Sequence, residues 1–342
     1  MDQNTEMRLE DAGTGSGVRF REFRPGDDAT IATSGEPYAI VDEQTGELLG
    51  GIGAAHEDTR RRSAEVTFRV LPRARRRGVA TTALREFGRH ALAGRLDRLE
   101  LLIPWDNPAA QRVALSAGYT REGVRRGAPE LIVYSRLAGD PEEPAPRLLP
   151  DLPGGELSDG VIILRPLGPA DVDFHTELQN LPEVVNTSVP PVPPSPAVIH
   201  ERCFHSEAHW LAGTRAELVI VEEATGIPAG EISLYYQEPP TAQAMIGYSV
   251  LPAYRGRGFA PRAAQLVALW VFAETDIARL IAGTLPTNTG SQRVLEKAGF
   301  TREAYLRSRL PGPDGARLDD VQYVLLAGDL LVQVSGAESS HA

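Results

Sequence analysis

Two arginine-rich loops that contain glycine are the parts of this chain best suited to bind an anion. The first is Arg75-Arg76-Arg77-Gly78-Val79-Ala80 and the second is Arg255-Gly256-Arg257-Gly258-Phe259-Ala260. Each loop follows a predicted strand and opens a predicted helix, so unpaired backbone N–H groups and the positive end of a helix dipole point at one place. Glycine allows close approach to the backbone, and arginine adds charge-assisted hydrogen bonds. A diphosphate suits this site, although a plain strand–helix turn explains one isolated loop equally well.

The two loops belong to a longer internal repeat. AEVTFRVLPRARRRGVATTALREFGRHALA matches AMIGYSVLPAYRGRGFAPRAAQLVALWVFA, with Gly258 lying 180 residues after Gly78. Downstream, NPAAQRVALSAGYTRE matches NTGSQRVLEKAGFTRE, with Asn288 lying 181 residues after Asn107. Because the matches keep the same order in both halves, the sequence indicates a duplicated domain and favours ligand binding over a plain turn.

Hydrophobic spacing predicts the same order of elements in each half, which indicates an α+β fold built on a mixed sheet flanked by helices. The predicted strands are 38–41, 48–54, 65–71 and 98–103 in the first half, and 218–222, 230–236, 244–251 and 279–284 in the second. The predicted helices are 80–91 and 109–117, then 260–274 and 291–298.

Composition sets the expected domain limits. Residues 138–160 hold five prolines and four glycines, which predicts a linker between an N-terminal domain at 18–137 and a C-terminal domain at 161–331. Residues 1–17 are predicted to be a disordered leader and 332–342 a frayed tail. The N-terminal domain is shortened, because PGDDATIATSGEP stands where the C-terminal domain has room for two helices.

The overall composition excludes several classes of protein. A net charge of −11 argues against a general nucleic-acid binder, which needs a basic face. No apolar run is long enough to cross a bilayer, and the first residues do not resemble a secretory signal. With Cys203 as the only cysteine, an intrachain disulfide is excluded and the cytoplasm is the expected compartment.

The loop pattern, followed by an asparagine and a helix ending in Ala-Gly-Tyr or Ala-Gly-Phe, resembles the GNAT acetyltransferase superfamily. The second half, from LRPLGPADVD through GYSVLPAYRGRGFA to NTGSQRVLEKAGF, is similar to the RimJ/RimL branch of ribosomal-protein alanine acetyltransferases. The resemblance implies two tandem GNAT-like domains, each with a mostly antiparallel sheet. It also implies acetyl-CoA, or another short acyl-CoA, as co-substrate and no metal.

The resemblance also implies a role for each matched residue. The strand backbone at Val70-Leu71 and Val250-Leu251 would pair with the pantetheine arm. The pyrophosphate would be held by the first loop, Arg75, Arg76, Arg77, Gly78, Val79 and Ala80, and by the second, Arg255, Gly256, Arg257, Gly258, Phe259 and Ala260. Asn107 and Asn288 would contact the pantetheine or the reacting centre.

The expected catalytic groups are divided between the domains. The tyrosine that many family members carry seven residues after the asparagine is replaced by Ala114 and Leu295. In the RimJ/RimL branch a serine three residues after the asparagine is the proposed acid, and Ser291 matches it. The branch often has a glutamate base where Glu65 stands in the first half, but the second half has Met245 there. Glu231 is a substitute base, or simply an exposed strand carboxylate.

We therefore expect an N-acetyltransferase with a catalytic C-terminal domain, in which a primary amine attacks the thioester directly. The acceptor is a small-molecule amine or a peptide or protein N-terminus, and the protein is a monomer or homodimer. One alternative is N-terminal catalysis with the acceptor site supplied by the C-terminal half; another is a non-catalytic acyl-CoA-binding protein. His200, His205 and His209 share one predicted helix, but without a further ligand pattern they favour a helix surface or pocket lining over a metal site.

Overall fold

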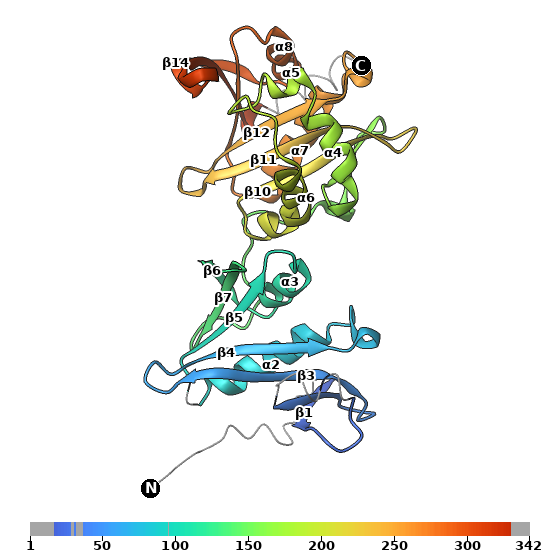
Figure 1. Ribbon diagram of the computed structural model, residues 1–342, viewed down its shortest axis with the longest axis vertical. Coiled ribbons are helices and arrows are strands. Elements are labelled where there is room, and N and C mark those ends of the chain that lie inside the picture. Colours follow the sequence, from blue (N-terminus) through green and yellow to red (C-terminus); the bar gives the residue numbers. More distant parts are fainter. Residues whose placement is uncertain (1–16, 29–30, 32–36, 95, 330–342) are drawn as a thin grey trace. The chain divides into compact units, whose positions relative to one another are not determined.

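The computed structural model describes residues 17–28, 31, 37–94 and 96–329, and it divides into two compact units at Pro146/Arg147. The predicted leader and tail therefore lie outside the described residues, apart from Gly17. Figure 1 shows one sheet in each unit. No described helix combines the length and the apolar composition that crossing a bilayer requires.

The N-terminal unit is built on a seven-stranded sheet with the strand order β1-β2-β3-β4-β5-β7-β6. Its strands are β1 Val18–Glu22, β2 Tyr38–Asp42, β3 Leu48–Asp58, β4 Ser63–Val70, β5 Arg98–Pro104, β6 Thr120–Arg125 and β7 Leu131–Leu137. Its helices are the short 3-10 turn Pro72–Ala74, α2 Val79–Leu92 and α3 Pro108–Ser116. The amphipathic α2 buries Leu84 and Phe87 against the sheet, where Phe87 meets Phe20 edge to face.

The C-terminal unit repeats this plan in an eight-stranded sheet with the order β14-β15-β13-β12-β11-β10-β9-β8. Its strands are β8 Leu157–Ser158, β9 Ile162–Pro166, β10 Arg215–Glu222, β11 Ile227–Glu238, β12 Gln243–Val250, β13 Arg279–Thr284, β14 Thr301–Pro311 and β15 Arg317–Leu326. Its helices are α4 Val172–Gln179, α5 Pro182–Val185, α6 Pro196–Leu211, α7 Phe259–Glu274 and α8 Thr289–Lys297. Short 3-10 turns lie at Pro153–Gly155, Pro169–Asp171, Pro239–Thr241, Pro252–Tyr254 and Pro313–Gly315.

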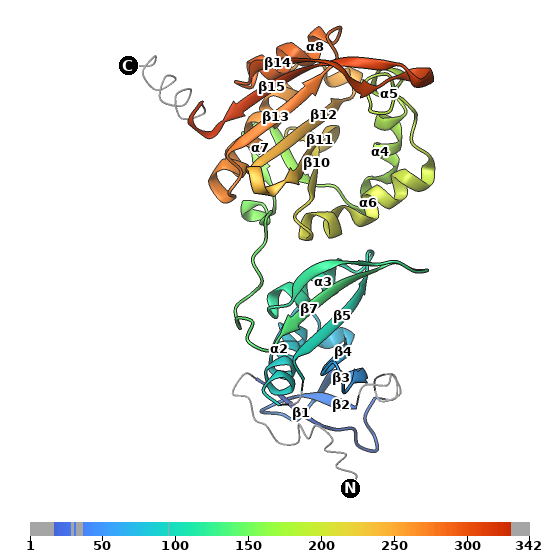
Figure 2. The same cartoon turned by 90° about the vertical axis from the view of Figure 1, so that its left-hand side faces the viewer.

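The helices of the C-terminal unit cover opposite faces of its sheet (Figure 2). The strongly apolar α7 buries Val267 and Val271 against one face, together with Ile232 and Leu280 of the sheet. On the other face, α4 and α6 pack over β10 and β11, where Cys203 meets Val219. The predicted α+β fold is confirmed, with a mixed sheet in each unit.

The predicted linker differs from the structure over its second half. Leu149 and Leu152 are buried in the C-terminal core, and the Trp210 indole N–H donates a 2.9 Å hydrogen bond to the Pro150 carbonyl. Further on, β8 pairs with β9 as an edge strand. The composition of a whole proline-rich segment does not indicate that two of its leucines pack against apolar residues elsewhere in the chain. Composition alone therefore could not predict this packing.

The prediction of a shortened N-terminal unit rests on the interval between β1 and β2. In the C-terminal unit the matching interval, between β9 and β10, holds α4, α5 and α6. In the N-terminal unit about half of the matching residues, 29–30 and 32–36, lie outside the described part of the chain. The expected lack of helices there stays a prediction.

Candidate active site

The two arginine-rich loops have the same backbone conformation. In the C-terminal loop Gly256 and Gly258 have φ of 74° and 82°, and α7 begins at the next residue, Phe259. In the N-terminal loop the matching values are 56° for Arg76 and 79° for Gly78. These left-handed residues turn the chain so that the first N–H groups of each helix, which lack intrahelical partners, face the loop.

Behind each loop, the two parallel strands of the sheet separate. β12 pairs with β13 only from Gln243–Met245 to Arg279–Ile281, and β4 pairs with β5 only from Ser63–Glu65 to Arg98–Glu100. Beyond this point β12 continues to pair with β11 as far as Val250. Beyond Met245, the backbone edge of β12 that faced β13 can therefore pair with another extended chain. A pantetheine arm needs this geometry.

A cavity of about 610 Å³ lies between the loop and α8 in the C-terminal unit. The predicted residues that line it are Val250, Arg255, Gly256, Gly258, Phe259, Ala260, Asn288 and Ser291. The lining residues that sequence reasoning missed include Glu183, Tyr248, Ser249, Arg293 and Lys297. The structure thus brings most of the predicted C-terminal site residues together around one space.

Three cationic side chains border this cavity. They are Arg255 from the loop and Arg293 and Lys297 from α8, and Lys297 is the only lysine of the chain. Arg255 is held by a 2.9 Å hydrogen bond to the Val250 carbonyl and a 2.7 Å ion pair with Glu183. The spacing of Arg293 and Lys297, one helical turn apart, is a signal that could have revealed them.

Among the C-terminal residues predicted to bind the cofactor, Leu251 and Arg257 are not among those lining the cavity. The Leu251 N–H is bonded to the Ala229 carbonyl. The Arg257 guanidinium pairs with Glu222 and lies 5.2 Å from the ring centre of Tyr254 and 4.9 Å from that of Phe259. Its position therefore supports the shape of the loop, and the predicted direct contact with phosphate stays a prediction.

The repeated asparagine begins a helix in both units. The Asn288 side-chain oxygen accepts a 3.1 Å hydrogen bond from the Ser291 N–H at the start of α8. Asn107 accepts the same bond, also 3.1 Å, from the Ala110 N–H at the start of α3. An N-cap of this kind typically stabilises its helix by about 1 kcal/mol. Through this bond Asn288 also fixes the position of Ser291.

Ser291 is paired with a tyrosine that the sequence did not single out. The Tyr248 hydroxyl lies 2.9 Å from the Ser291 Oγ and 3.2 Å from its carbonyl oxygen. Burial raises the pKa of Tyr248 to about 12, although the bond to Ser291 acts in the opposite direction. At neutral pH the hydroxyl therefore keeps its proton and can donate it to Ser291. In the N-terminal unit, Phe68 and Ala110 occupy the two matching positions.

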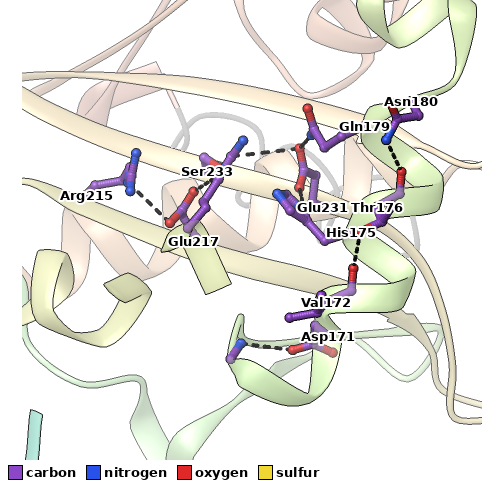
Figure 3. A network of polar contacts seen from close by, with 12 residues as sticks. Asp171, Val172, His175, Thr176, Gln179, Asn180, Arg215, Glu217, Glu231 and Ser233 are labelled. Atoms are coloured by element: carbon purple, nitrogen blue, oxygen red, sulfur yellow. Dashed lines mark hydrogen bonds and ion pairs between the residues drawn. The ribbon is translucent and has the colours of Figure 1, made fainter. Parts of the chain in front are cut away.

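Glu231 belongs to a buried polar network on the α4/α6 face of the sheet (Figure 3). Its Oε2 lies 2.9 Å from Nδ1 of His175, while its Oε1 accepts a hydrogen bond from Gln179 and lies 3.9 Å from Arg202. Arg202 in turn pairs with Glu217, which also lies 3.2 Å from Arg215.

This network determines what Glu231 can do. Burial, the strongest single influence, raises the pKa of its carboxyl, but Arg202, His175 and Gln179 together hold that pKa below the ordinary value. Glu231 is not among the residues that line the cavity. The alternative reading of Glu231 as an exposed carboxylate is wrong, because its residue is only 7% exposed. A carboxylate whose oxygens are already occupied by His175, Gln179 and Arg202 is also poorly placed to accept a proton from an amine.

Removing Glu231 should strongly destabilise the C-terminal unit. Glu231→Ala leaves the half-buried Arg202 and the buried His175 without this carboxylate, and breaking a buried ion pair costs about 3–5 kcal/mol. The native pKa of Glu231 is below the ordinary glutamate value. The extra free energy of unfolding that Glu231 gives to wild type is therefore fully present above the ordinary pKa, and it decreases as the pH falls through the native pKa. Chemical denaturation at several pH values measures this difference.

A matched control for this prediction is Glu177→Ala, which removes an exposed carboxylate from α4, the helix that carries the Glu231 partners His175 and Gln179. We expect a change within about 0.5 kcal/mol for that variant. Equal unfolding free energies for the two variants would contradict a stabilising role for the network.

Glu65 and the histidines lie apart from these groups. Glu65 is half-buried in β4 opposite Glu100 of β5, at the last paired position before the strands separate. His200 stacks on Phe204 with ring centres 4.0 Å apart, and His205 lies 3.8 Å from Glu201. Within the described ranges, no group of three His, Cys, Asp or Glu residues could hold a metal ion.

Comparisons with known proteins agree with this geometry. The model of the acetyltransferase (GNAT) domain family matches residues 19–120 and again 162–301. A probable N-acetyltransferase of Bacillus subtilis, YjcK, is 43% identical over 67 residues, which are 20% of this chain and 37% of that protein. The uncharacterized N-acetyltransferase YnaD of the same organism is 36% identical over 66 residues, 19% of this chain and 39% of its own length. The chain thus spans well under half the length of these two relatives.

Solved structures of this fold include RimJ of Mycobacterium smegmatis in complex with a CoA-disulfide, at 23% identity and a TM-score of 0.46, covering 52% of this chain and 90% of that one. A ribosomal-protein-S5-alanine acetyltransferase from Vibrio fischeri is 20% identical with a TM-score of 0.45, covering 51% and 98%. Because the family model matches both halves and most of its sequence, the chain belongs to the acetyltransferase (GNAT) family, whose N-acetyltransferases use acetyl-CoA.

Proposed function

We propose that this protein transfers an acetyl or short acyl group from acyl-CoA to a primary amine, and that its C-terminal domain is the catalytic one. The observation that carries this assignment is the Tyr248–Ser291 pair at the cavity, which Phe68 and Ala110 replace in the other domain. The two sites are otherwise similar, but only the C-terminal copy has hydroxyl groups at these two positions.

The residues around the cavity suit direct attack on a thioester. Arg255, Arg293 and Lys297 supply positive charge for the phosphates, and the free edge of β12 can pair with the pantetheine amides. Unpaired backbone N–H groups on that edge can stabilise the oxyanion that forms when the amine attacks. Ser291, held by Asn288 and Tyr248, is placed to protonate the departing thiolate.

The acceptor is a primary amine, either a small molecule or the N-terminus of a peptide or protein. In this assignment the N-terminal domain is a shortened copy with a similar loop but without the two hydroxyl groups. N-terminal catalysis is the second candidate. It is favoured by Glu65, which lies where β4 and β5 separate, and by the matching conformation of the first loop.

Mass spectrometry of the protein purified without added ligand tests which acyl-CoA it carries, and titration calorimetry with acetyl-CoA gives the number of sites. We expect one tight site per chain, together with thiol release when a panel of amines is supplied. Acyl-CoA binding without thiol release from any amine would instead favour the non-catalytic acyl-CoA-binding reading.

A further inference from the structure

Asp320 on β15 is a buried carboxylate outside the network around Glu231. Its residue is 4% exposed, and its Oδ1 has no hydrogen-bond partner in the part of the chain that the structure describes. Its Oδ2 lies 3.7 Å from Nε of Arg309, a side chain that is 56% exposed. The neighbouring hydroxyl of Thr284 is also buried without a partner among the described residues. Two unsatisfied polar groups therefore lie near the end of β13, the Asp320 carboxylate on the face of Gly283 and the Thr284 hydroxyl on the other face.

The strand register places this carboxylate beside the gap between β12 and β13. The parallel pairing ends at Met245 and Ile281, and two residues further along the strands lie Gly247 and Gly283. A Cβ atom on Gly283 would come within 2.7 Å of the Asp320 Oδ1, whereas one on Gly247 would meet nothing within 4 Å. Glycine at 283 thus makes room for the carboxylate, and glycine at 247 leaves open space on the opposite strand.

All these positions lie on one face of the sheet. Side chains alternate along a strand, so Gly247 shares a face with Ser249, which pairs with Glu231 under α4. Gly283 pairs with Gln322, two residues from Asp320, which puts Asp320 on the same face. Tyr248 and its partner Ser291 lie on the opposite face. Asp320 therefore approaches the separating strands from the side opposite to the thiolate-protonating group.

The fold does not need a carboxylate here. In the N-terminal unit the same strand positions hold Leu102, Ile103 and Leu131 in place of Gly283, Thr284 and Asp320. Burial raises the pKa of Asp320, against the opposing effects of Arg309 and the Thr284 N–H. A buried carboxylate with an unpaired oxygen lowers the stability of the folded state, so its presence points to a ligand.

We propose that Asp320 binds the ammonium group of the acceptor and takes its proton. This role rests on the proposed function, which leaves the base unassigned because Glu231 is already bound by His175, Gln179 and Arg202. The carboxylate accepts one N–H proton and becomes the acid, and the neutral amine then forms the C–N bond with the thioester carbonyl.

The remaining steps balance with groups already present. When the C–S bond breaks, the thiolate takes the Ser291 proton. The second proton lost by the nitrogen restores Ser291, and Asp320 releases its own proton to solvent. The products are the amide, the thiol and one proton.

The test compares Asp320→Asn with Asp319→Asn, the same chemical change in the adjacent, opposite-facing side chain that pairs with Tyr305. For Asp320→Asn we expect kcat/KM for the amine to fall about 100-fold. The dissociation constant of acetyl-CoA should not change, and the rise of kcat/KM with pH should be lost. Asp319→Asn should keep the wild-type rate and pH profile.

Stability supplies a second readout. A carboxyl whose native pKa is raised loses stability as the pH climbs from its unfolded to its native value. Asp320→Asn should therefore have a higher melting temperature than wild type at pH 8, and the two melting temperatures should become equal at acidic pH. Asp320→Leu, which takes the residue type of the N-terminal copy, should also fold and should be inactive.

The outcomes separate the two proposals. An active wild type with an unchanged Asp320→Asn variant overturns the role of Asp320 and leaves the proposed function standing. Loss of acetyl-CoA binding or of stability in both Asp320 variants shows a structural role and also overturns it. A wild type that binds acetyl-CoA but acylates no amine overturns the proposed function and, with it, this inference.

Discussion

Gly258→Glu should abolish acetyl-CoA binding and turnover. The residue has φ of 82° and open space around its Cβ position, so glutamate can be accommodated with about 1–2 kcal/mol of backbone strain. Its carboxylate would then lie at the N-terminus of α7, where the pyrophosphate is expected. We expect the affinity for acetyl-CoA to fall at least about 100-fold, or roughly 3 kcal/mol. Titration calorimetry and thiol release measure the two losses.

The duplicated chain supplies the control for this prediction. Gly78 has nearly the same φ, 79°, and the same open surroundings, so Gly78→Glu imposes the same strain and charge on the other loop. It should leave turnover close to wild type. Gly258→Ala separates the two effects, because it adds the strain without the carboxylate. If Gly78→Glu alone abolishes activity, the N-terminal domain is the catalytic one.

Ser291→Ala should lower kcat about 100-fold, in the range that general acids contribute, with little change in acetyl-CoA affinity. Tyr248→Phe removes the hydroxyl that donates to Ser291 and should cost about 10-fold, because the serine remains but is less well oriented. The double variant should be no slower than Ser291→Ala, because Tyr248 acts through Ser291. Steady-state kinetics with thiol detection measures all three.

Tyr323→Phe is the matched control for the tyrosine. Its hydroxyl is also buried and lies 3.2 Å from Glu296 of α8, so the variant loses a comparable hydrogen bond away from the cavity. A small loss of stability with unchanged kcat is the expected result. Wild-type kcat in Ser291→Ala would exclude Ser291 as the acid.

Local sequence patterns predicted many of the strands and helices correctly. The strand predicted at 279–284 is β13, and helices predicted at 80–91 and 260–274 lie within α2 and α7. These elements depend on spacing between near neighbours, which a sequence displays directly. The loops were found for the same reason, since glycine followed by a helix defines their geometry. The linker was the weak point, because Leu149 and Leu152 are buried by partners far along the chain.

Side-chain partnerships could not be read from the sequence in the same way. Tyr248 and Ser291 are 43 residues apart, and they meet because α8 begins over the separating ends of β12 and β13. Glu231 was expected to be available as a base. Its burial depends on helices α4 and α6, which place His175 and Arg202 against it. Strand register brings Asp320 beside Gly283, and no short motif contains both residues.

The sequence by itself therefore determined that the chain holds two copies of one loop, strand and helix pattern, since repetition and spacing are written along the chain. The sequence also showed that the copies differ at the positions of Ser291 and Glu65, but only the tertiary structure decided which side chains act together in each copy. One copy combines Tyr248 with Ser291 and buries Asp320, whereas the other has Phe68, Ala110 and Leu131. The physical reason is that reactivity depends on which distant side chains meet in one cavity or on one face of a sheet, and on how deeply each of them is buried.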